Sequence, residues 1–260
     1  MQYYMGIDVG SLSTDGVLID GDKNIIKSII LPTGASIKKT ISRCRDELLL
    51  TDDGGKIEPV AVVATGYGRK RVEFADHILT EITAHALGAR HLFPETRTVI
   101  DIGGQDTKVI YLDEKGRVAD FAMNDKCAAG TGRFIEVMAR ILELDLEEMA
   151  DIAINAGESV EITSTCTVFI ESEIISLIAD THKIDSIASG VFRSIAGRII
   201  SMVSNVSGKS PFTFTGGVAK NRGMVDAIRK TLQGDIFVPD DPQVTGALGA
   251  AIFALIHVKG

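Results

Sequence analysis

Two hydrophobic patterns alternate along the chain. Short apolar runs that end at Gly or Asp are typical of buried strands, whereas longer segments repeat apolar residues every three or four positions, as amphipathic helices do. The helical spacing is clearest in Phe134, Val137, Met138, Ile141 and Leu142, and in Ile187, Val191, Ile195, Ile199 and Val203. Strands are expected near residues 3–9, 15–20, 25–31, 60–64, 97–103, 106–112, 117–122, 211–215 and 235–238. Helices are expected near 36–50, 80–92, 131–143, 167–180, 185–205, 221–233 and 245–257. This order predicts an α/β fold.

The chain also contains an internal repeat. The segments Asp8-Val9-Gly10-Ser11-Leu12-Ser13-Thr14 and Asp101-Ile102-Gly103-Gly104-Gln105-Asp106-Thr107 both follow the pattern Asp-x-Gly-x-x-x-Thr between two apolar runs. Each copy therefore predicts a strand, a tight turn and a second strand. Two such units predict two similar domains that face each other across a cleft. We expect residues 1–94 with 245–260 to form the first domain and residues 95–244 the second.

Composition and charge narrow the functional classes. The 260 residues, 45% of them hydrophobic, are enough for one large or two medium-sized domains. The net charge of −8 argues against a nucleic-acid partner. The longest apolar run, from Gly246 to Val258, is shorter than the roughly 20 residues that cross a bilayer, so no membrane association is expected. No secretory signal precedes the first strand and the three cysteines are far apart, which indicates a reducing, cytoplasmic location.

Three glycine turns are candidate phosphate-binding elements, because unhindered backbone N–H groups can converge on phosphate oxygens. They are Gly10-Ser11, Gly103-Gly104 and Thr215-Gly216-Gly217. Asp8 and Asp101 stand where strands enter the first two turns, and a carboxylate beside a phosphate implies a hydrated Mg²⁺ between them. Hydroxyl donors to phosphate are expected from Ser11, Ser13 and Thr14, and orientation of an attacking water from Gln105 or Asp106. Neither a Walker A motif nor a dinucleotide-binding fingerprint is present.

These turns resemble the nucleotide motifs of the superfamily that contains acetate and sugar kinases, heat-shock chaperone ATPases and actin. Gly6–Ser11 resembles its phosphate 1 motif, Asp101–Asp106 its phosphate 2 motif and Phe214–Asn221 its adenosine motif. The resemblance implies two ribonuclease-H-like domains that close over ATP, with Asp8, Asp101 and Gln105 as catalytic residues. The residues expected to bind the nucleotide are Gly10, Ser11, Leu12, Ser13, Thr14, Gly103, Gly104, Gln105, Asp106, Gly130, Gly216, Gly217, Val218, Lys220, Asn221 and Gln243.

Two of the three cysteines have an unusual context. A lone cysteine is most often a small buried hydrophobic residue, which is what we expect of Cys44. Cys127 and Cys166 each precede a predicted helix, whose N-terminus favours an anion such as a thiolate-bound iron–sulfur cluster. Gly130 and Gly132 would let the backbone approach such a cluster closely. Two thiolates cannot hold a cube, but two chains would supply four.

The cysteine segments resemble those of one narrower family, the activating ATPases of 2-hydroxyacyl-CoA dehydratases, which includes ATPase subunits of benzoyl-CoA reductase. The resemblance covers nearly the whole chain and rests on Ala64–Arg69, Asp101–Asp106, Asn124–Phe134, Ser164–Phe169 and Gly246–Ala251. It implies a homodimer in which Cys127 and Cys166 of both chains ligate one [4Fe-4S] cluster between two diverging helices. It further implies that ATP hydrolysis, with Mg²⁺, drives an electron from ferredoxin or flavodoxin to an iron–sulfur client enzyme.

Several alternatives stay open at this point. The client is a 2-hydroxyacyl-CoA dehydratase or a related reductase with a double-cubane cluster; a ring-reducing complex fits less well because its ATPase subunits usually work as unlike pairs. A small-molecule kinase or a chaperone-like ATPase on the same scaffold would have no use for the paired cysteines. We interpret His85, His91 and His182 as surface or packing residues, and Glu171 and Glu173 as contacts to nucleotide or partner or as ordinary first-turn acids.

Overall fold

The computed structural model describes residues 2–51, 53–163 and 166–257. It divides the chain into two compact units. Unit 1 comprises Met1–Thr96, Asp113–Val118 and Gln243–Gly260, and unit 2 comprises Arg97–Leu112 and Ala119–Pro242. Unit 1 is therefore discontinuous, because its last segment follows the whole of unit 2 in the sequence.

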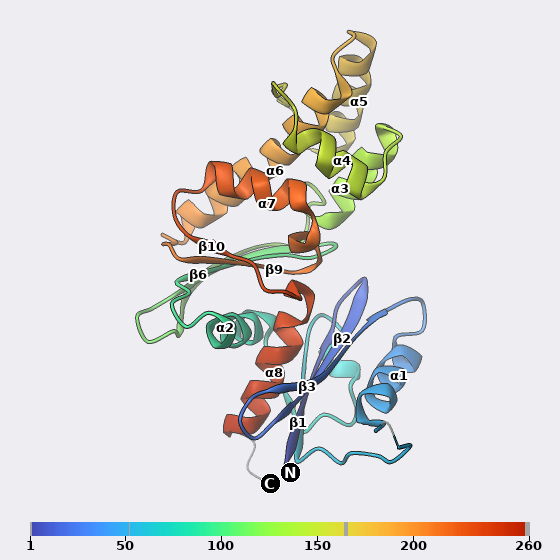
Figure 1. Ribbon diagram of the computed structural model, residues 1–260, viewed down its shortest axis with the longest axis vertical. Coiled ribbons are helices and arrows are strands. Elements are labelled where there is room, and N and C mark those ends of the chain that lie inside the picture. The colour runs from blue at the N-terminus through green and yellow to red at the C-terminus, as the bar shows by residue number, and fades with distance from the viewer. Residues whose placement is uncertain (1, 52, 164–165, 258–260) are drawn as a thin grey trace. The chain divides into compact units, whose positions relative to one another are not determined.

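Unit 1 is a five-stranded mixed sheet with helices on both faces (Figure 1). Its strand order is β3-β2-β1-β4-β5; β1 to β3 are antiparallel, and β4 and β5 run parallel to β1. The strands are β1 Tyr3–Val9, β2 Ser13–Asp20, β3 Ile25–Pro32, β4 Ala61–Thr65 and β5 His77–Ile78. The helices are α1 Ile37–Leu49, α2 Glu81–Leu92 and α8 Thr245–His257, with 3₁₀ turns η1 Arg69–Arg71 and η3 Pro242–Val244.

Alternation along β1 decides which side chains meet which helix. Met5, Ile7 and Val9 point to one face and pack with α1, whereas Tyr4, Gly6 and Asp8 lie on the face covered by α2 and α8. Glycine is required where α8 crosses the sheet, since a Cβ at Gly6 would overlap the carbonyl of Ala247. This close approach holds the start of α8 beside Asp8.

Unit 2 repeats the same sheet. Its order is β8-β7-β6-β9-β10, with β6 antiparallel to β7 and parallel to β9, as β1 is to β2 and β4. The strands are β6 Thr98–Ile102, β7 Thr107–Leu112, β8 Val118–Asn124, β9 Phe212–Thr215 and β10 Ile236–Phe237. The helices are α3 Gly132–Ile141, α4 Leu146–Ile154, α5 Thr167–Ala179, α6 Ile184–Asn205 and α7 Arg222–Thr231, with the 3₁₀ turn η2 Gly217–Lys220. The predicted α/β fold with two ribonuclease-H-like domains is confirmed.

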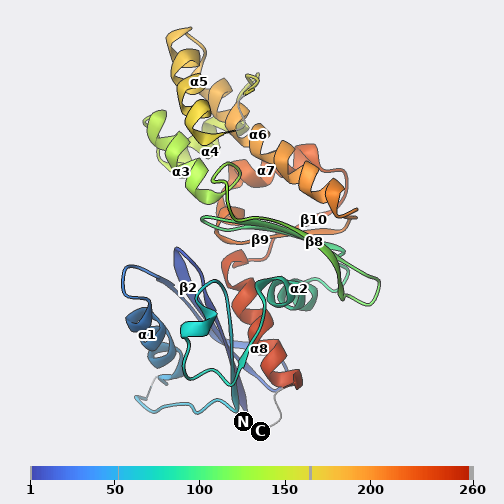
Figure 2. The same ribbon diagram turned by 180° about the vertical axis from the view of Figure 1, so that it is seen from behind.

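The core of unit 2 lies between this sheet and its helices. Ile100, Ile102 and Phe214 of the sheet pack with Phe134 of α3 and Phe192 of α6. Figure 2 shows α6 and α7 along one face of the sheet, and α3, α4 and α5 gathered near one end of α6. By length and composition α6 would qualify as a membrane span, but 56% of its most apolar window is buried inside the fold, as in a core helix.

One helix of unit 2 was absent from the sequence prediction. Helix α4 begins after Asp145, whose side chain accepts from the N–H groups of Glu147 and Glu148, while the Glu148 carboxylate accepts from the Asp145 N–H. This capping box, Asp-x-x-Glu, was legible in the sequence. The expected helix at 131–143 accordingly ends sooner, at Ile141, and a short turn leads into α4.

Candidate functional site

The two copies of the repeat form the same turn. In unit 1 the Gly10 N–H donates to the Ser13 carbonyl at 2.8 Å, and in unit 2 the Gly103 N–H donates to the Asp106 carbonyl at 2.9 Å. Each turn closes a hairpin in which the threonine of the repeat pairs with the second residue, Val9 with Thr14 and Ile102 with Thr107. The hairpin reading of the repeat is thus confirmed in both units.

The carboxylate of Asp8 lies beneath the first turn in a close-fitting enclosure. The residue is 8% exposed, and its Oδ2 lies 3.9 Å from His85 Nε2. A Cβ at Gly246 would overlap Asp8 Oδ2, and a Cβ at Gly66 would overlap Asp8 Oδ1. The first turn of α8, where the helix dipole is positive, therefore lies against the negatively charged group. His85, interpreted from the sequence as surface or packing, is buried beside this carboxylate.

Other predicted nucleotide residues of unit 1 surround the same turn. Ser11 and Leu12 are exposed at its tip. The Gln243 amide donates to Ser13 Oγ at 3.0 Å, so the last segment of the chain reaches the first turn. Thr14 is buried and shares a hydrogen bond with Thr33, whose hydroxyl also donates to the Gly10 carbonyl at 2.9 Å. Thr33, for which the sequence predicted no role, directly follows β3 and stabilises the turn through this hydrogen bond.

The second turn contains a lysine that the sequence analysis missed. Lys108 Nζ lies 3.2 Å from Asp101 Oδ2 and 2.7 Å from Asp106 Oδ2. The side chains of Lys108 and Asp101 are each 3% exposed. Thr215 Oγ1 donates to the other Asp101 oxygen, Oδ1, at 3.0 Å. The sequence contained a signal for this contact. In the hairpin, the residue after the threonine of the repeat pairs with the aspartate of the repeat, and in unit 2 that residue is Lys108.

The third turn adjoins the second within unit 2. Gly216 has φ +86°, and a Cβ there would lie 2.5 Å from the Ile102 carbonyl oxygen, so the close approach of β9 to β6 requires glycine. Gly217, Val218 and Lys220 belong to η2, which follows. Asn221 caps α7 by accepting from the Met224 N–H at 3.0 Å, and Lys220 pairs with Asp241 at 3.0 Å.

The two exposed cysteines occupy different local structures. Cys166 is the N-cap residue of α5, and its carbonyl accepts the first helical hydrogen bond, from Ile170 N–H, at 2.9 Å. Cys127 instead lies in a turn before α3, where its N–H donates to Asn124 Oδ1 at 3.2 Å. Both cysteines precede a helix, as expected, but only Cys166 is the cap residue itself, because a turn separates Cys127 from α3 at Gly132. Ser164 and Thr165, part of the Cys166 motif, lie outside the described residues.

Backbone hydrogen bonds connect the Cys127 segment to the second turn. The N–H groups of Gly132 and Arg133, at the start of α3, donate to the carbonyls of Gly103 and Gly104 at 2.9 and 2.8 Å. Thr107 Oγ1 donates to the Gly130 carbonyl at 2.7 Å, and Gly130 has φ +97°. These N–H groups of α3 thus serve the turn instead of facing an anion, which corrects the role expected of that helix start.

Helix α5, which begins after Cys166, exposes several apolar side chains. Val168 and Phe169, in the first turn of α5, are each 67% exposed, and Ile175 further along is 54% exposed. Glu173 of α5 accepts from the N–H and the hydroxyl of Thr163, both at 2.8 Å, and so holds Thr163 against the helix. Within the described residues, no group of three or more His, Cys, Asp or Glu side chains gathers as a metal site would need.

Cys44 is the one fully buried thiol, and burial raises its pKa to about 12, with smaller contributions from the charges of Asp15 and Glu47. We expect a thiol reagent at pH 9 to label two cysteines per metal-free chain and Cys44 only after unfolding. Because the folded state keeps a proton that the unfolded state loses above pH 9, the stability that this thiol contributes is full below pH 9 and declines as pH rises toward 12.

The matched variant for this prediction is Cys44→Ala, which removes the buried thiol and leaves both exposed ones. Its urea-unfolding free energy should fall less steeply than that of the wild type above pH 9, with two thiols labelled before and after unfolding. Three thiols labelled in the folded wild type would contradict the prediction.

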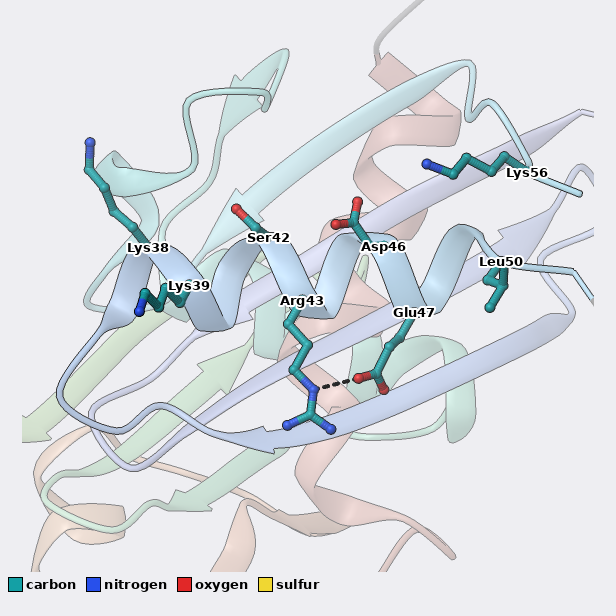
Figure 3. A pocket seen from close by; sticks show the side chains of 8 residues that line it. All are labelled: Lys38, Lys39, Ser42, Arg43, Asp46, Glu47, Leu50 and Lys56. Carbon is teal, nitrogen blue, oxygen red and sulfur yellow. Dashed lines mark hydrogen bonds and ion pairs between the residues drawn. The ribbon is translucent and has the colours of Figure 1, made fainter. Parts of the chain in front are cut away.

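An open hollow lies on unit 1, along the exposed side of α1 (Figure 3). The side chains that line it are Lys38, Lys39, Ser42, Arg43, Asp46, Glu47, Leu50 and Lys56. They project separately from the helix and the loop after it, and Arg43 pairs with Glu47 one helical turn away. None of them is a predicted nucleotide or cluster residue, and the mixed charges are those of a solvated helix face.

Residues 5–254 match the family model described as the BadF/BadG/BcrA/BcrD ATPase family. The chain belongs to this ATPase family. The 2-hydroxyisocaproyl-CoA dehydratase activator of Clostridioides difficile is 44% identical over 257 residues, which cover 99% of this chain and 96% of that protein. The activator of lactoyl-CoA dehydratase from Anaerotignum propionicum is 44% identical over 252 residues, or 97% of each chain.

A solved structure of an activator of this kind has the same fold as this chain. The activator of the 2-hydroxyisocaproyl-CoA dehydratase from Clostridium difficile, with bound ADPNP, has a TM-score of 0.87 and 43% identity, and covers 98% of this chain and 94% of that one. The resemblance to the activating ATPases of 2-hydroxyacyl-CoA dehydratases, which the sequence motifs indicated, is thereby confirmed.

Proposed function

We propose that this member of the BadF/BadG/BcrA/BcrD ATPase family is an ATP-hydrolysing activator that passes a low-potential electron to an iron–sulfur client enzyme. The main support for the proposal is the set of hydrogen bonds in unit 2 that connects the Gly103-Gly104 turn with the segment containing Cys127. One exposed cysteine lies in a segment that is hydrogen-bonded to a phosphate-type glycine turn, through Gly132, Arg133 and Thr107. A small-molecule kinase would have no use for such a connection.

ATP is the ligand that the glycine turns favour. Their backbone N–H groups suit phosphate oxygens, and the ADPNP-bound relative supports an adenine nucleotide here as well. The buried carboxylate of Asp8 is an oxygen donor of the kind that hydrated Mg²⁺ prefers, and Mg²⁺ would neutralise phosphate charge. Gln105 is exposed in the second turn, where its amide would orient the attacking water.

The thiols of Cys127 and Cys166 fit a shared [4Fe-4S] cluster. Both are exposed and free, whereas Cys44 is buried and protonated. Such a cluster needs four thiolates and would accept and release one electron. Because each chain offers two exposed thiols, we place the cluster between two copies, where the apolar first turn of α5 would also be covered.

The chain's own hydrogen bonds provide a route from nucleotide to cysteine. When the γ-phosphate leaves, the Gly103-Gly104 turn loses a ligand, and its carbonyls are the acceptors that hold the start of α3. A shift of this turn would move Gly130 and the Asn124–Cys127 contact with it. Hydrolysis would thereby change how the thiolates present the cluster to the partner.

The client that we favour is a 2-hydroxyacyl-CoA dehydratase, because two relatives at 44% identity are named as activators of such enzymes. A reductase with a double-cubane cluster is the alternative within the same function. Ferredoxin or flavodoxin would supply the electron in the cytoplasm, under anaerobic conditions that preserve an exposed cluster.

Anaerobic purification with iron and sulfide analysis, together with molar mass from light scattering, tests the proposal. We expect a brown dimer with about four irons shared by two chains. A colourless protein that stays free of iron after cluster reconstitution, yet hydrolyses ATP, would contradict the redox role. It would direct the search to kinase substrates.

A further inference from the structure

The two hairpins differ in charge at the residue that pairs with the first aspartate of the repeat. In unit 1 the residue paired with Asp8 across the hairpin is Asp15, whereas in unit 2 the residue paired with Asp101 is Lys108. Residues that pair across two strands project to the same face of the sheet, so the side chain of Asp8 lies beside that of Asp15, and the side chain of Asp101 beside that of Lys108. The first turn therefore has two buried acids beneath it, and the second has an acid and a buried ammonium.

The Asp101 carboxylate is held by the chain itself. Its Oδ2 faces the Lys108 ammonium at 3.2 Å, and its Oδ1 accepts from the Thr215 hydroxyl at 3.0 Å. A second cation would have to approach a carboxylate that already has one, against the repulsion of a buried ammonium. These surroundings do not fit the magnesium role expected of Asp101.

Lys108 also determines the shape of the turn. Its Nζ lies 2.7 Å from Asp106 Oδ2, and the Asp106 carbonyl accepts the Gly103 N–H that closes the turn. The same ammonium thus connects the residue that enters the turn, Asp101, with the residue that closes it. Because the Lys108 side chain is 3% exposed and the Asp106 side chain 26%, salt screens these contacts much less than it screens a surface ion pair.

We propose that Lys108 takes the place of a metal ion in unit 2: its ammonium holds Asp101 and Asp106, fixes the Gly103–Asp106 turn, and leaves Asp8 as the aspartate that anchors the divalent cation. Lys108 is a positioning residue, acting through the two carboxylates. The inference rests on the proposed function, since it requires that a nucleotide and its cation bind at these turns.

Binding of Mn²⁺, measured by electron paramagnetic resonance, tests the inference without any turnover. The full-length, anaerobically purified protein is titrated with Mn²⁺ in the presence of a non-hydrolysable ATP analogue, as wild type, Asp8→Asn and Asp101→Asn. We expect Asp8→Asn to weaken Mn²⁺ binding by about tenfold or more. Asp101→Asn should leave the affinity and the Mn²⁺ spectrum unchanged. Equal weakening by both substitutions would overturn the inference.

Substitution of the lysine gives a second, independent outcome. Lys108→Met removes the ammonium and leaves two carboxylates facing each other, so this variant should bind one additional Mn²⁺ per chain. Lys108→Arg keeps the charge and should bind as the wild type does. A folded Lys108→Met protein without the additional ion would count against the proposal, and if this variant does not fold, the Asp101→Asn titration decides.

Calorimetric titration of the wild type with the ATP analogue distinguishes a failure of the proposed function from a failure of the assignment of Lys108. If the nucleotide does not bind, the proposed function fails and the inference fails with it. If the nucleotide binds and Asp101→Asn loses Mn²⁺, the inference alone is wrong.

Discussion

Replacement of Cys166 by alanine should abolish electron transfer to the client while ATP hydrolysis continues. The thiol stands at the N-cap of α5 with its side chain exposed, so its removal leaves the helix and the glycine turns in place. In the proposed dimer the substitution would leave only two of the four thiolates, too few to hold a cube, and we expect the iron content to fall from about four per dimer to near zero. Iron analysis, ATPase rate and reduction of a client enzyme are measured on the same preparation.

Cys44→Ala is the matched control, because it removes a thiol of the same chain that is buried and protonated. It should keep the iron and the electron transfer. Cys127→Ala should behave as Cys166→Ala does, although Cys127 lies in a turn and not at a helix start. Full electron transfer by Cys166→Ala would show that this thiol is not a ligand and would refute the shared cluster.

Substitution of Gly246 by alanine is expected to lower ATP turnover by about a hundredfold. A Cβ at this position would overlap Asp8 Oδ2 and lie 3.0 Å from His85 Nε2, so either the carboxylate or the whole start of α8 must move. Overpacking of this kind also costs about 1–3 kcal/mol of the free energy of unfolding. Turnover at saturating ATP and urea unfolding measure the two effects separately.

Gly197→Ala provides the comparison for the stability effect. Gly197 lies within α6, and a Cβ there meets nothing within 4 Å. Alanine in an exposed helix position is about 1 kcal/mol more favourable than glycine, so this variant should be more stable than the wild type and fully active. If Gly246→Ala hydrolysed ATP as Gly197→Ala does, the enclosure of Asp8 would have no bearing on catalysis.

Local patterns predicted most of the fold because each unit is built from strongly periodic segments. The repeat Asp-x-Gly-x-x-x-Thr specifies a hairpin by itself, and the structure contains that hairpin in both units with the same closing hydrogen bond, from Gly10 and from Gly103. The start of α5 at Thr167 likewise agrees with its sequence pattern. Helix α4 escaped notice although its capping box is a local signal.

The residues that escaped prediction act through contacts that sequence periodicity does not encode. His85 is one of several buried positions of α2, and it reaches Asp8 only because α2 packs against α8, which in turn packs on β1. Thr33 reaches Gly10 because β3 returns beside the first turn. Lys108 is intermediate: its pairing with Asp101 follows from the hairpin register, but its burial depends on the surrounding fold.

The discontinuity of unit 1 imposes an order on biosynthesis. As the chain emerges from the ribosome, all of unit 2 is complete before Gln243–His257 appears. Until then β1 lacks the helix that covers Gly6 and Asp8, and an apolar sheet face with a carboxylate in it stays exposed to water. Unit 2 can thus fold first as an independent body, while the first glycine turn is finished by residues that are translated after the whole of unit 2.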